Sequence, residues 1–330
     1  MANFDLLGLE KNKISRDLGS FTNFIYGQSK VGKSTLVSKI NTDSNLFIST
    51  EKGYSALNIY TVDLTNWSET NALLRQLKDP KVKEKFSMVT IDTVDILYSL
   101  CQDYVIKING VQSLSDKPYG VLFGQVDKLF NDFILGIQRA GYGITFIGHA
   151  KAQSKLAKKN NNIEAEIEYM MPSLTKRGYQ IVSALVDNIW YCDIDVDEEG
   201  NEVRVLRTRA TKEFAAGSRF KYLPSVIPMD ADILTKELRT AIDKEENTTD
   251  EKKPLFVEET KVDFDEIKEE LTRLVTNIFA PNDAMAIVTK TVEHYLGVGN
   301  RVADATEQEA DALQLIYDEL LMYAEDNNLK

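Results

Sequence analysis

The sequence predicts an α/β fold with a mostly parallel central sheet, followed by a small helical module. Short apolar runs alternate with stretches of helical spacing over residues 21–149, which is typical of parallel strands joined by helices. A glycine-rich phosphate-binding pattern follows the first apolar run. Three amphipathic helical patterns fill the last part of the chain. We therefore expect a core over residues 1–243, an acidic flexible linker over 244–263 and an acidic three-helix module over 264–330.

The elements of the core follow from hydrophobic periodicity and from turn signals. Apolar runs predict strands over residues 21–26, 45–50, 86–92 and 142–149, with a weaker one over 59–64. Helical spacing fills the gaps between them, over residues 34–40, 66–77, 94–108 and 121–140. Further along, we expect a helix over 173–184, a hairpin from 186–194 and 202–209, and a helix from Asp230 to about residue 242.

The helices of the module have recognisable ends. The first pattern starts at residue 264 and stops before Pro281. The second, over residues 285–296, has Gly297 at its C-cap. Thr306 and Glu309 form a capping box before the third. Packing these three faces together would bury their apolar residues.

The phosphate-binding pattern lies within FTNFIYGQSKVGKSTLVSKI, residues 21–40. Gly27, Gly32, Lys33 and Ser34 complete the form G-x-x-x-x-G-K-[ST]. Glycines allow backbone N–H groups to face phosphate oxygens, and the dipole of the following helix favours the negative charge. Lys33 would neutralise the β- and γ-phosphates during catalysis, and the Ser34 hydroxyl would bind Mg²⁺. The residues expected to bind ATP are Gly27, Gln28, Ser29, Lys30, Val31, Gly32, Lys33, Ser34 and Thr35.

Three polar residues stand at the carboxyl ends of expected strands: Glu51, Asp92 and His149. Ligands bind at that edge of an open parallel sheet. Asp92 is expected to bind Mg²⁺ together with Ser34. Glu51 is expected to orient and deprotonate the attacking water, and His149 to sense the γ-phosphate. The alternatives are a surface glutamate, a helix-capping aspartate and a core histidine.

Charge and composition restrict the function further. The net charge of −12 divides into +2 over residues 1–228 and −14 over residues 229–330, which indicates a nucleotide-binding core with an acidic appendage. The amino terminus lacks a secretory pattern, and no segment approaches the ~18 apolar residues of a membrane span. Cys101 and Cys192 have no metal-ligand spacing. We expect a cytoplasmic protein without a membrane partner.

The motif set resembles that of RecA-like P-loop ATPases. Ser49-Thr-Glu51-Lys, Thr90-Ile-Asp92-Thr-Val-Asp and Phe146-Ile-Gly-His149 follow the loop in the order and spacing of that group. The chain looks most similar to phage-encoded members, including those grouped with phage single-strand annealing proteins. The resemblance covers about residues 20–225, with the motifs inside 20–228. It implies a RecA-like P-loop NTPase core that uses ATP and Mg²⁺.

The resemblance also implies contacts with single-stranded DNA. In RecA-like folds the strand that ends in the sensor leads into a mobile DNA-binding loop, here residues 150–171. This stretch is polar and without convincing periodicity, so we expect a loop. Glutamates in its second half leave open a solvated loop with no DNA contact. The lysines expected to contact phosphates are Lys151, Lys155, Lys158 and Lys159.

A neighbouring subunit is implied as well, because RecA-like rings and filaments complete each site with a cation supplied in trans. Arg219 occupies a setting similar to the Lys-x-Arg signature of related ATPases. Gly217 stands where that signature has its lysine, and Lys212 is the substitute from another position. An ordinary surface arginine is the alternative.

The expected function is an ATPase that is stimulated by DNA and by assembly. It would form a homo-oligomeric ring or filament on single-stranded DNA and promote annealing or strand exchange in phage recombination, in the bacterial cytoplasm. One alternative is an ATP-driven helicase or loader-type motor on DNA. Another is a nucleotide-gated protein-binding scaffold. The acidic module could dock a protein partner, compete with DNA as a brake, or act as a solubilising appendage.

Overall fold

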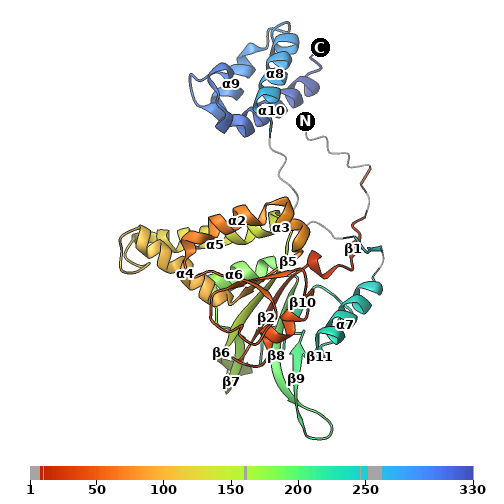
Figure 1. Ribbon diagram of the computed structural model, residues 1–330. Helices are drawn as coiled ribbons and strands as arrows, with labels where there is room; N and C mark the ends of the chain where they lie inside the picture. The colour runs from red at the N-terminus through yellow and green to blue at the C-terminus, as the bar shows by residue number, and fades with distance from the viewer. Residues whose placement is uncertain (1–7, 10, 160–161, 246, 252–261, 330) are drawn as a thin grey trace. The chain divides into compact units, whose positions relative to one another are not determined.

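The computed structural model describes residues 8–9, 11–159, 162–245, 247–251 and 262–329, without the side chains of residues 155–159 and 162–167. The chain divides into two compact units, one within residues 5–257 and one within residues 258–330 (Figure 1).

The larger unit is built on a sheet with the strand order β11-β9-β8-β2-β6-β5-β3-β4. Its strands from β8 to β4 in that order are parallel to their neighbours, so the predicted α/β fold with a mostly parallel sheet is confirmed. Strand β6 is inserted between β2 and β5. The bounds of the parallel strands are β2 Thr22–Gly27, β3 Asn45–Ser49, β4 Tyr60–Asp63, β5 Met88–Asp92, β6 Gly143–Lys159 and β8 Asn188–Val196.

Antiparallel strands extend this sheet. Strand β9 (Glu202–Arg207) pairs with β8, and β11 (Val226–Pro228) pairs with β9. Strand β10 (Gly217–Ser218) also pairs with β8. A separate two-stranded sheet joins β1 (Ile14–Ser15) to β12 (Thr248–Thr249).

Helices cover both faces of the main sheet (Figure 1). Phe24 and Tyr26 of β2 pack with residues of α4, α5 and α6, while Ile25 between them packs with residues of α1 and α7. Successive side chains of a strand point to opposite faces, so the apolar run of β2 joins two cores in a three-layer arrangement. The bounds are α1 Lys33–Ser38, α2 Thr70–Leu77, α3 Pro80–Lys85, α4 Val94–Ile108, α5 Val121–Arg139, α6 Lys176–Leu185 and α7 Ala231–Asp243, with 3₁₀ helices at Leu18–Ser20, Trp67–Glu69 and Pro118–Gly120.

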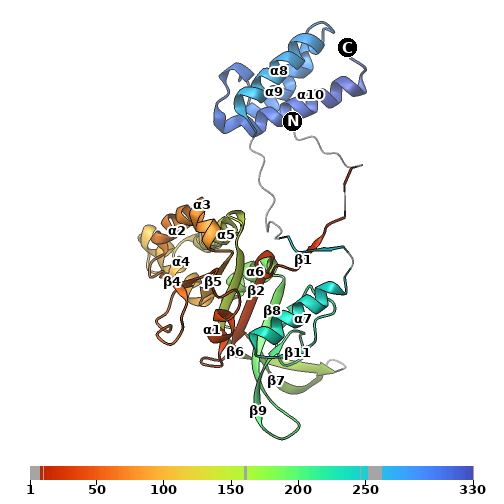
Figure 2. The same ribbon diagram turned by 45° about the vertical axis from the view of Figure 1, so that its right-hand side comes forward.

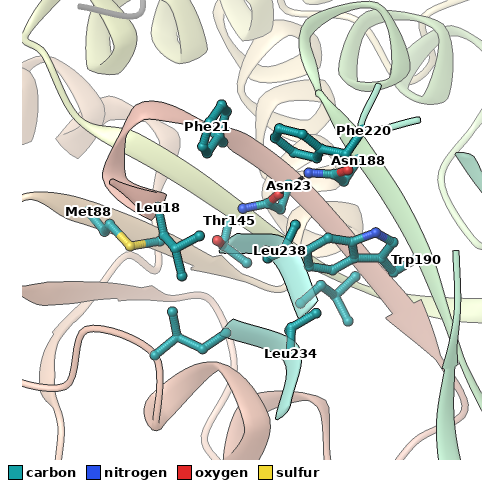
Figure 3. A pocket seen from close by; sticks show the side chains of 12 residues that line it. Leu18, Phe21, Asn23, Met88, Thr145, Asn188, Trp190, Phe220, Leu234 and Leu238 are labelled. Carbon is teal, nitrogen blue, oxygen red and sulfur yellow. Dashed lines mark hydrogen bonds between the residues drawn. The ribbon is translucent and has the colours of Figure 1, made fainter. Parts of the chain in front are cut away.

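The layer between α7 and the sheet is closely packed. Trp190, Leu234 and Leu238 are among the residues that line a hollow of about 10 Å³. Figure 3 shows how these side chains lie. At the polar end of the hollow, Asn188 Nδ2 donates to Asn23 Oδ1 over 2.8 Å. A volume of this size holds about one water molecule. The hollow is therefore a packing defect, too small for a ligand.

The expected loop over residues 150–171 is wrong. Strand β6 continues past His149 to Lys159, and β7 (Asn162–Pro172) returns antiparallel to it, with a register shift between Ala157 and Lys158. The apolar residues 163, 165, 167 and 169 alternate with glutamates, a period of two that favours a strand. We call these paired strands from residue 150 onward the β6–β7 ribbon. It runs out beyond the sheet edge where β2 ends (Figure 2).

The chain remains attached to the larger unit after α7. Arg16 donates to Asp243 over 2.5 Å and to Asp250 over 3.2 Å, and β12 pairs with β1. The first residues of the expected linker therefore pack against the amino-terminal segment. Residues 252–261 of that linker lie outside the described part of the chain.

The smaller unit is helical. Helix α8 (Phe264–Leu274) continues into a π-helical turn at Val275–Phe279, and α9 (Met285–Leu296) and α10 (Ala310–Asp326) follow, with 3₁₀ helices at Val302–Asp304 and Glu307–Glu309. Thr306 and Glu309 form the predicted capping box. The core contains Leu271, Phe279, Leu313, Ile316 and Leu320. Among the described helices of both units, none combines the length and apolar composition of a membrane span.

Candidate nucleotide site

The phosphate-binding loop joins β2 to α1 as the sequence predicts. Strand β2 ends at Gly27, and α1 begins at Lys33 with Gly32 as its N-cap. Gly32 has a φ of 107°, a left-handed conformation that glycine adopts without steric cost. The loop therefore turns sharply and directs the first N–H groups of α1 toward the sheet edge.

Lys33 is buried inside this loop. Its Nζ donates to the carbonyl oxygens of Gly27 over 3.1 Å and of Gln28 over 2.8 Å. Burial lowers the pKa of Lys33, although the carboxylates of Asp92, Asp95 and Glu51 act in the opposite direction. The ammonium group is thus held by main-chain oxygens, next to the positions that phosphate oxygens occupy in such loops.

Ser34 and Asp92 meet at the edge of the sheet. Ser34 Oγ donates to Asp92 Oδ2 over 2.5 Å, and Tyr54 Oη donates to the Asp92 carbonyl over 3.3 Å. Burial raises the pKa of Asp92, and the hydrogen bond from Ser34 opposes that effect. Within the described residues, no group of three or more His, Cys, Asp or Glu could hold a metal ion unaided. Two oxygens fit Mg²⁺, which takes its other ligands from phosphates and water.

Glu51 is anchored to the end of β5. Its Oε1 accepts a hydrogen bond of 2.8 Å from Thr93 Oγ1. The Thr93 N–H donates to Thr50 Oγ1 over 2.9 Å, and that hydroxyl donates to the Thr93 carbonyl over 3.0 Å. These bonds join the chain after β3 to the chain after β5, so the Glu51 carboxylate has a defined position beside Asp92.

His149 lies between Glu51 and an acid that sequence reasoning missed. His149 Nε2 is 3.8 Å from Glu51 Oε1, and His149 Nδ1 is 2.9 Å from Asp95 Oδ2. Asp95 stands in the first turn of α4, and its Oδ2 also accepts a hydrogen bond of 3.1 Å from Ser173 Oγ. The sequence motif around Asp92 contains Asp95, but only the fold shows that it faces the histidine.

An open pocket of about 110 Å³ lies at this edge of the sheet. The five residues expected to carry chemistry, Lys33, Ser34, Glu51, Asp92 and His149, all contribute to it. His149 does so because β6 lies between β2 and β5 and places residue 149 level with Gly27. The remaining lining residues are Ser29, Lys30, Gly53, Tyr54 and Thr93.

An arginine approaches the loop from its other side and was also missed. A Cβ added to Gly32 would lie 3.5 Å from Arg204 Nη1 and 3.4 Å from Met229 Cε. Arg204 is exposed and pairs with Ile194 in the β8–β9 hairpin. It lies within β9, on the side of β2 opposite to β5. Among the described residues, none forms a hydrogen bond or ion pair with its guanidinium. Only the hairpin register brings this cation to Gly32.

The two candidate trans cations lie outside the pocket of their own chain. Arg219 is 67% exposed and its Nη1 is 3.0 Å from Asp187 Oδ1. Asp187 also accepts from the N–H of Thr22, so Arg219 is at the opposite end of β2 from the loop. Lys212 is exposed in the turn after β9, close to where Phe214 bridges to Met170 of β7.

Of the four expected DNA-binding lysines, the structure describes one side chain. Lys151 is exposed, and its Nζ donates to the carbonyls of Leu174 over 3.1 Å and Ser173 over 3.4 Å. Lys155, Lys158 and Lys159 belong to β6, but their side chains lie outside the described part of the structure.

The chain matches a known protein family over much of its length. A model described as an AAA domain, AAA_24, matches residues 21–220 of this chain. That span is more than half of the 330 residues and contains the phosphate-binding loop, the pocket, the ribbon and both candidate trans cations. Curated proteins give no match to the chain.

Proposed function

The chain belongs to the AAA domain family AAA_24, and from this premise we propose that it is a RecA-like ATPase that works on single-stranded DNA. The observation that carries the proposal is the convergence of Lys33, Ser34, Glu51, Asp92 and His149 on one pocket at the carboxyl edge of a parallel sheet. A cation in a phosphate-binding loop, two oxygen ligands for Mg²⁺ and a carboxylate placed to accept a proton suit hydrolysis of ATP.

Each residue has a distinct role in the proposed reaction. The N–H groups of residues 28–35 hold the phosphates, and Lys33 neutralises charge that develops as the terminal phosphoryl group leaves. Ser34 and Asp92 would hold Mg²⁺, which would offset the negative charge of the phosphates. Glu51 orients a water molecule and takes its proton. The bond from Thr93 Oγ1 fixes Glu51 for that task.

Arg204 supports binding of the nucleotide from the opposite side. The acids lie toward β5 and β3, so the terminal phosphate is expected on that side of the loop. The nucleoside and its first phosphate then lie toward β9, within reach of Arg204 at Gly32. A guanidinium donates several hydrogen bonds in a fixed plane, which suits phosphate oxygens.

The β6–β7 ribbon is the proposed DNA-binding element. One strand carries both His149 and the lysines, so a change at the pocket has a direct route along β6 to the ribbon. Residues 1–228, which include the ribbon, also lack the strong negative charge of residues 229–330, which would repel DNA. A homo-oligomer on the strand, with Arg219 or Lys212 reaching the neighbour's pocket, completes the proposal.

The proposal is tested by the ATPase rate and by DNA retention in low salt. Single-stranded DNA is expected to raise the rate, and the ATP-bound protein is expected to retain DNA. Electron microscopy with and without a non-hydrolysable analogue then shows whether ATP controls assembly. A DNA-independent rate together with no retention would contradict the recombination function. Strand displacement or a stable closed hexamer would identify a motor instead.

A further inference from the structure

Asp95 is the centre of a small hydrogen-bond network between the pocket and Ser173, the residue that follows the β6–β7 ribbon. Its Oδ2 lies 2.9 Å from His149 Nδ1 and accepts 3.1 Å from Ser173 Oγ. The Ser173 N–H also donates to the His149 carbonyl over 2.8 Å. Ser173 directly follows the last residue of β7. One carboxylate oxygen therefore contacts both the imidazole and the residue where the ribbon ends.

We propose that Asp95 is a positioning residue. It fixes the tautomer and ring orientation of His149 and links this ring to Ser173, at the end of the ribbon. This inference rests on the proposed ATPase function for its catalytic meaning. Its structural content, the state of the His149 ring, stands on the contacts alone.

The tautomer follows from the chemistry of the two partners. An ionised carboxylate accepts hydrogen bonds and donates none, so His149 Nδ1 must carry the proton shared with Asp95. Asp95 stands in the first turn of α4, an end of the helix where carboxylate side chains are commonly found. Ser173 Oγ donates a second hydrogen bond to the same oxygen, Asp95 Oδ2.

The proton on Nδ1 determines the state of the other ring nitrogen, Nε2. With Nδ1 protonated, the neutral ring presents Nε2 as an acceptor toward Glu51 Oε1, at 3.8 Å. Two acceptors at that separation suit a bridging water, since each can take one of its protons. His149 then helps Glu51 orient the attacking water. Contact with a phosphate oxygen through Nε2 would require the doubly protonated ring.

The environment of the other oxygen of Asp95 indicates that its carboxylate is held in a fixed position. Asp95 Oδ1 is buried and has no hydrogen-bond partner among the described residues. A buried polar atom without a partner costs stability, which is the kind of strain found at functional sites. Oδ1 of Asp95 bears this cost, while Oδ2 forms hydrogen bonds with His149 and Ser173.

Nitrogen NMR of the full chain tests the tautomer directly. The chain has only two histidines, His149 and His294, and His294 in α9 serves as an internal reference. Ring ¹⁵N shifts at alkaline pH are expected to show Nδ1 protonated and Nε2 bare in His149. Asp95→Asn should give a mixture of tautomers, because an amide can either accept from Nδ1–H or donate to bare Nδ1. A wild-type ring protonated at Nε2, or shifts unchanged in the variant, would overturn the proposal.

Kinetics provide the second arm, with Asp103→Asn as the matched control on an exposed position of the same helix. Asp95→Asn is expected to lower kcat by about 10- to 100-fold, the range found for carboxylates that orient metal-binding histidines. The Kd for ATP should stay within about threefold, because Asp95 does not line the pocket. A kcat equal to that of the control would contradict the positioning role. If the wild type hydrolyses no ATP, the proposed function fails, and the wild-type NMR spectrum still decides the tautomer.

Discussion

Ser34 and Asp92 are 58 positions apart in the sequence, and the hydroxyl of one donates to the carboxylate of the other over 2.5 Å. This bond joins the start of α1 to the end of β5 at the point where Mg²⁺ would bind. Asp92 is buried, and burial raises its pKa. Burial thus disfavours the ionised form of Asp92, which is the form that would bind Mg²⁺.

Asp92→Asn is expected to stabilise the protein in the absence of nucleotide and Mg²⁺ while abolishing hydrolysis. An acid whose pKa is raised by folding ionises more readily in the unfolded chain. The wild type therefore loses stability relative to the variant as the pH rises from the ordinary Asp value of about 3.9 to the raised pKa, and the difference then stays constant. Urea unfolding from pH 4 to pH 8 measures it. A variant less stable than the wild type at neutral pH would contradict this view.

Arg204→Ala is expected to weaken nucleotide binding more than catalysis. Loss of a hydrogen bond from a charged donor costs about 1.5–3 kcal/mol, which corresponds to about a 10- to 150-fold rise in the Kd for ADP. At saturating ATP the rate should fall by less than about threefold, because Arg204 lies on the side of the loop away from Glu51. Calorimetric titration with ADP measures the change. Arg239→Ala, at an exposed position of α7, is the matched control. Equal affinities in the two variants would exclude the contact.

The lysines of the ribbon are expected to set the salt dependence of DNA binding. Each phosphate contact with single-stranded DNA contributes about 0.7 to the slope of log K against log salt. Replacing Lys151, Lys155, Lys158 and Lys159 by alanine should therefore reduce that slope by up to about 3. Fluorescence anisotropy with labelled oligonucleotide at several salt concentrations provides the measurement. A slope unchanged from the wild type would place the DNA elsewhere.

The trans role of Arg219 can be separated from its ion pair with Asp187. Arg219 is exposed, and Asp187, which is 17% exposed, also accepts from the Thr22 N–H, so Arg219→Ala should lower the free energy of unfolding by only about 1 kcal/mol. If the guanidinium acts on a neighbour's nucleotide, turnover should fall by about 10³-fold or more. Mixing Arg219→Ala subunits with Glu51→Gln subunits should restore part of the rate, because some interfaces then combine an intact Glu51 with an intact Arg219. Mixtures no more active than either variant would refute this.

The sequence predicts the parts of the site that depend on local pattern. The loop from Gly27 to Ser34 is specified by its own residues. Asp92 and His149 follow apolar strands, and parallel strands bring such positions to one edge, so their proximity follows from topology. The ribbon was missed because the lysines and glutamates after His149 suggested a loop, although the alternation in β7 favours a strand.

The residues that could not be predicted depend on tertiary register. Asp95 looks like an ordinary residue of a helix start, and its partners His149 and Ser173 are 54 and 78 positions away. Arg204 reaches Gly32 only because β9 pairs with β8 two residues beyond the level of Gly27. No local signal distinguishes it from other surface arginines.

The central claim is that Glu51 activates the water that attacks ATP, and Glu51→Gln tests it most directly. Single-turnover hydrolysis should slow by about 10²- to 10⁴-fold, with ATP bound as tightly as in the wild type, so that the variant retains intact nucleotide. Glu84→Gln, on an exposed position of α3, should behave as the wild type. A Glu51→Gln protein that turns over ATP at the wild-type rate would contradict the account.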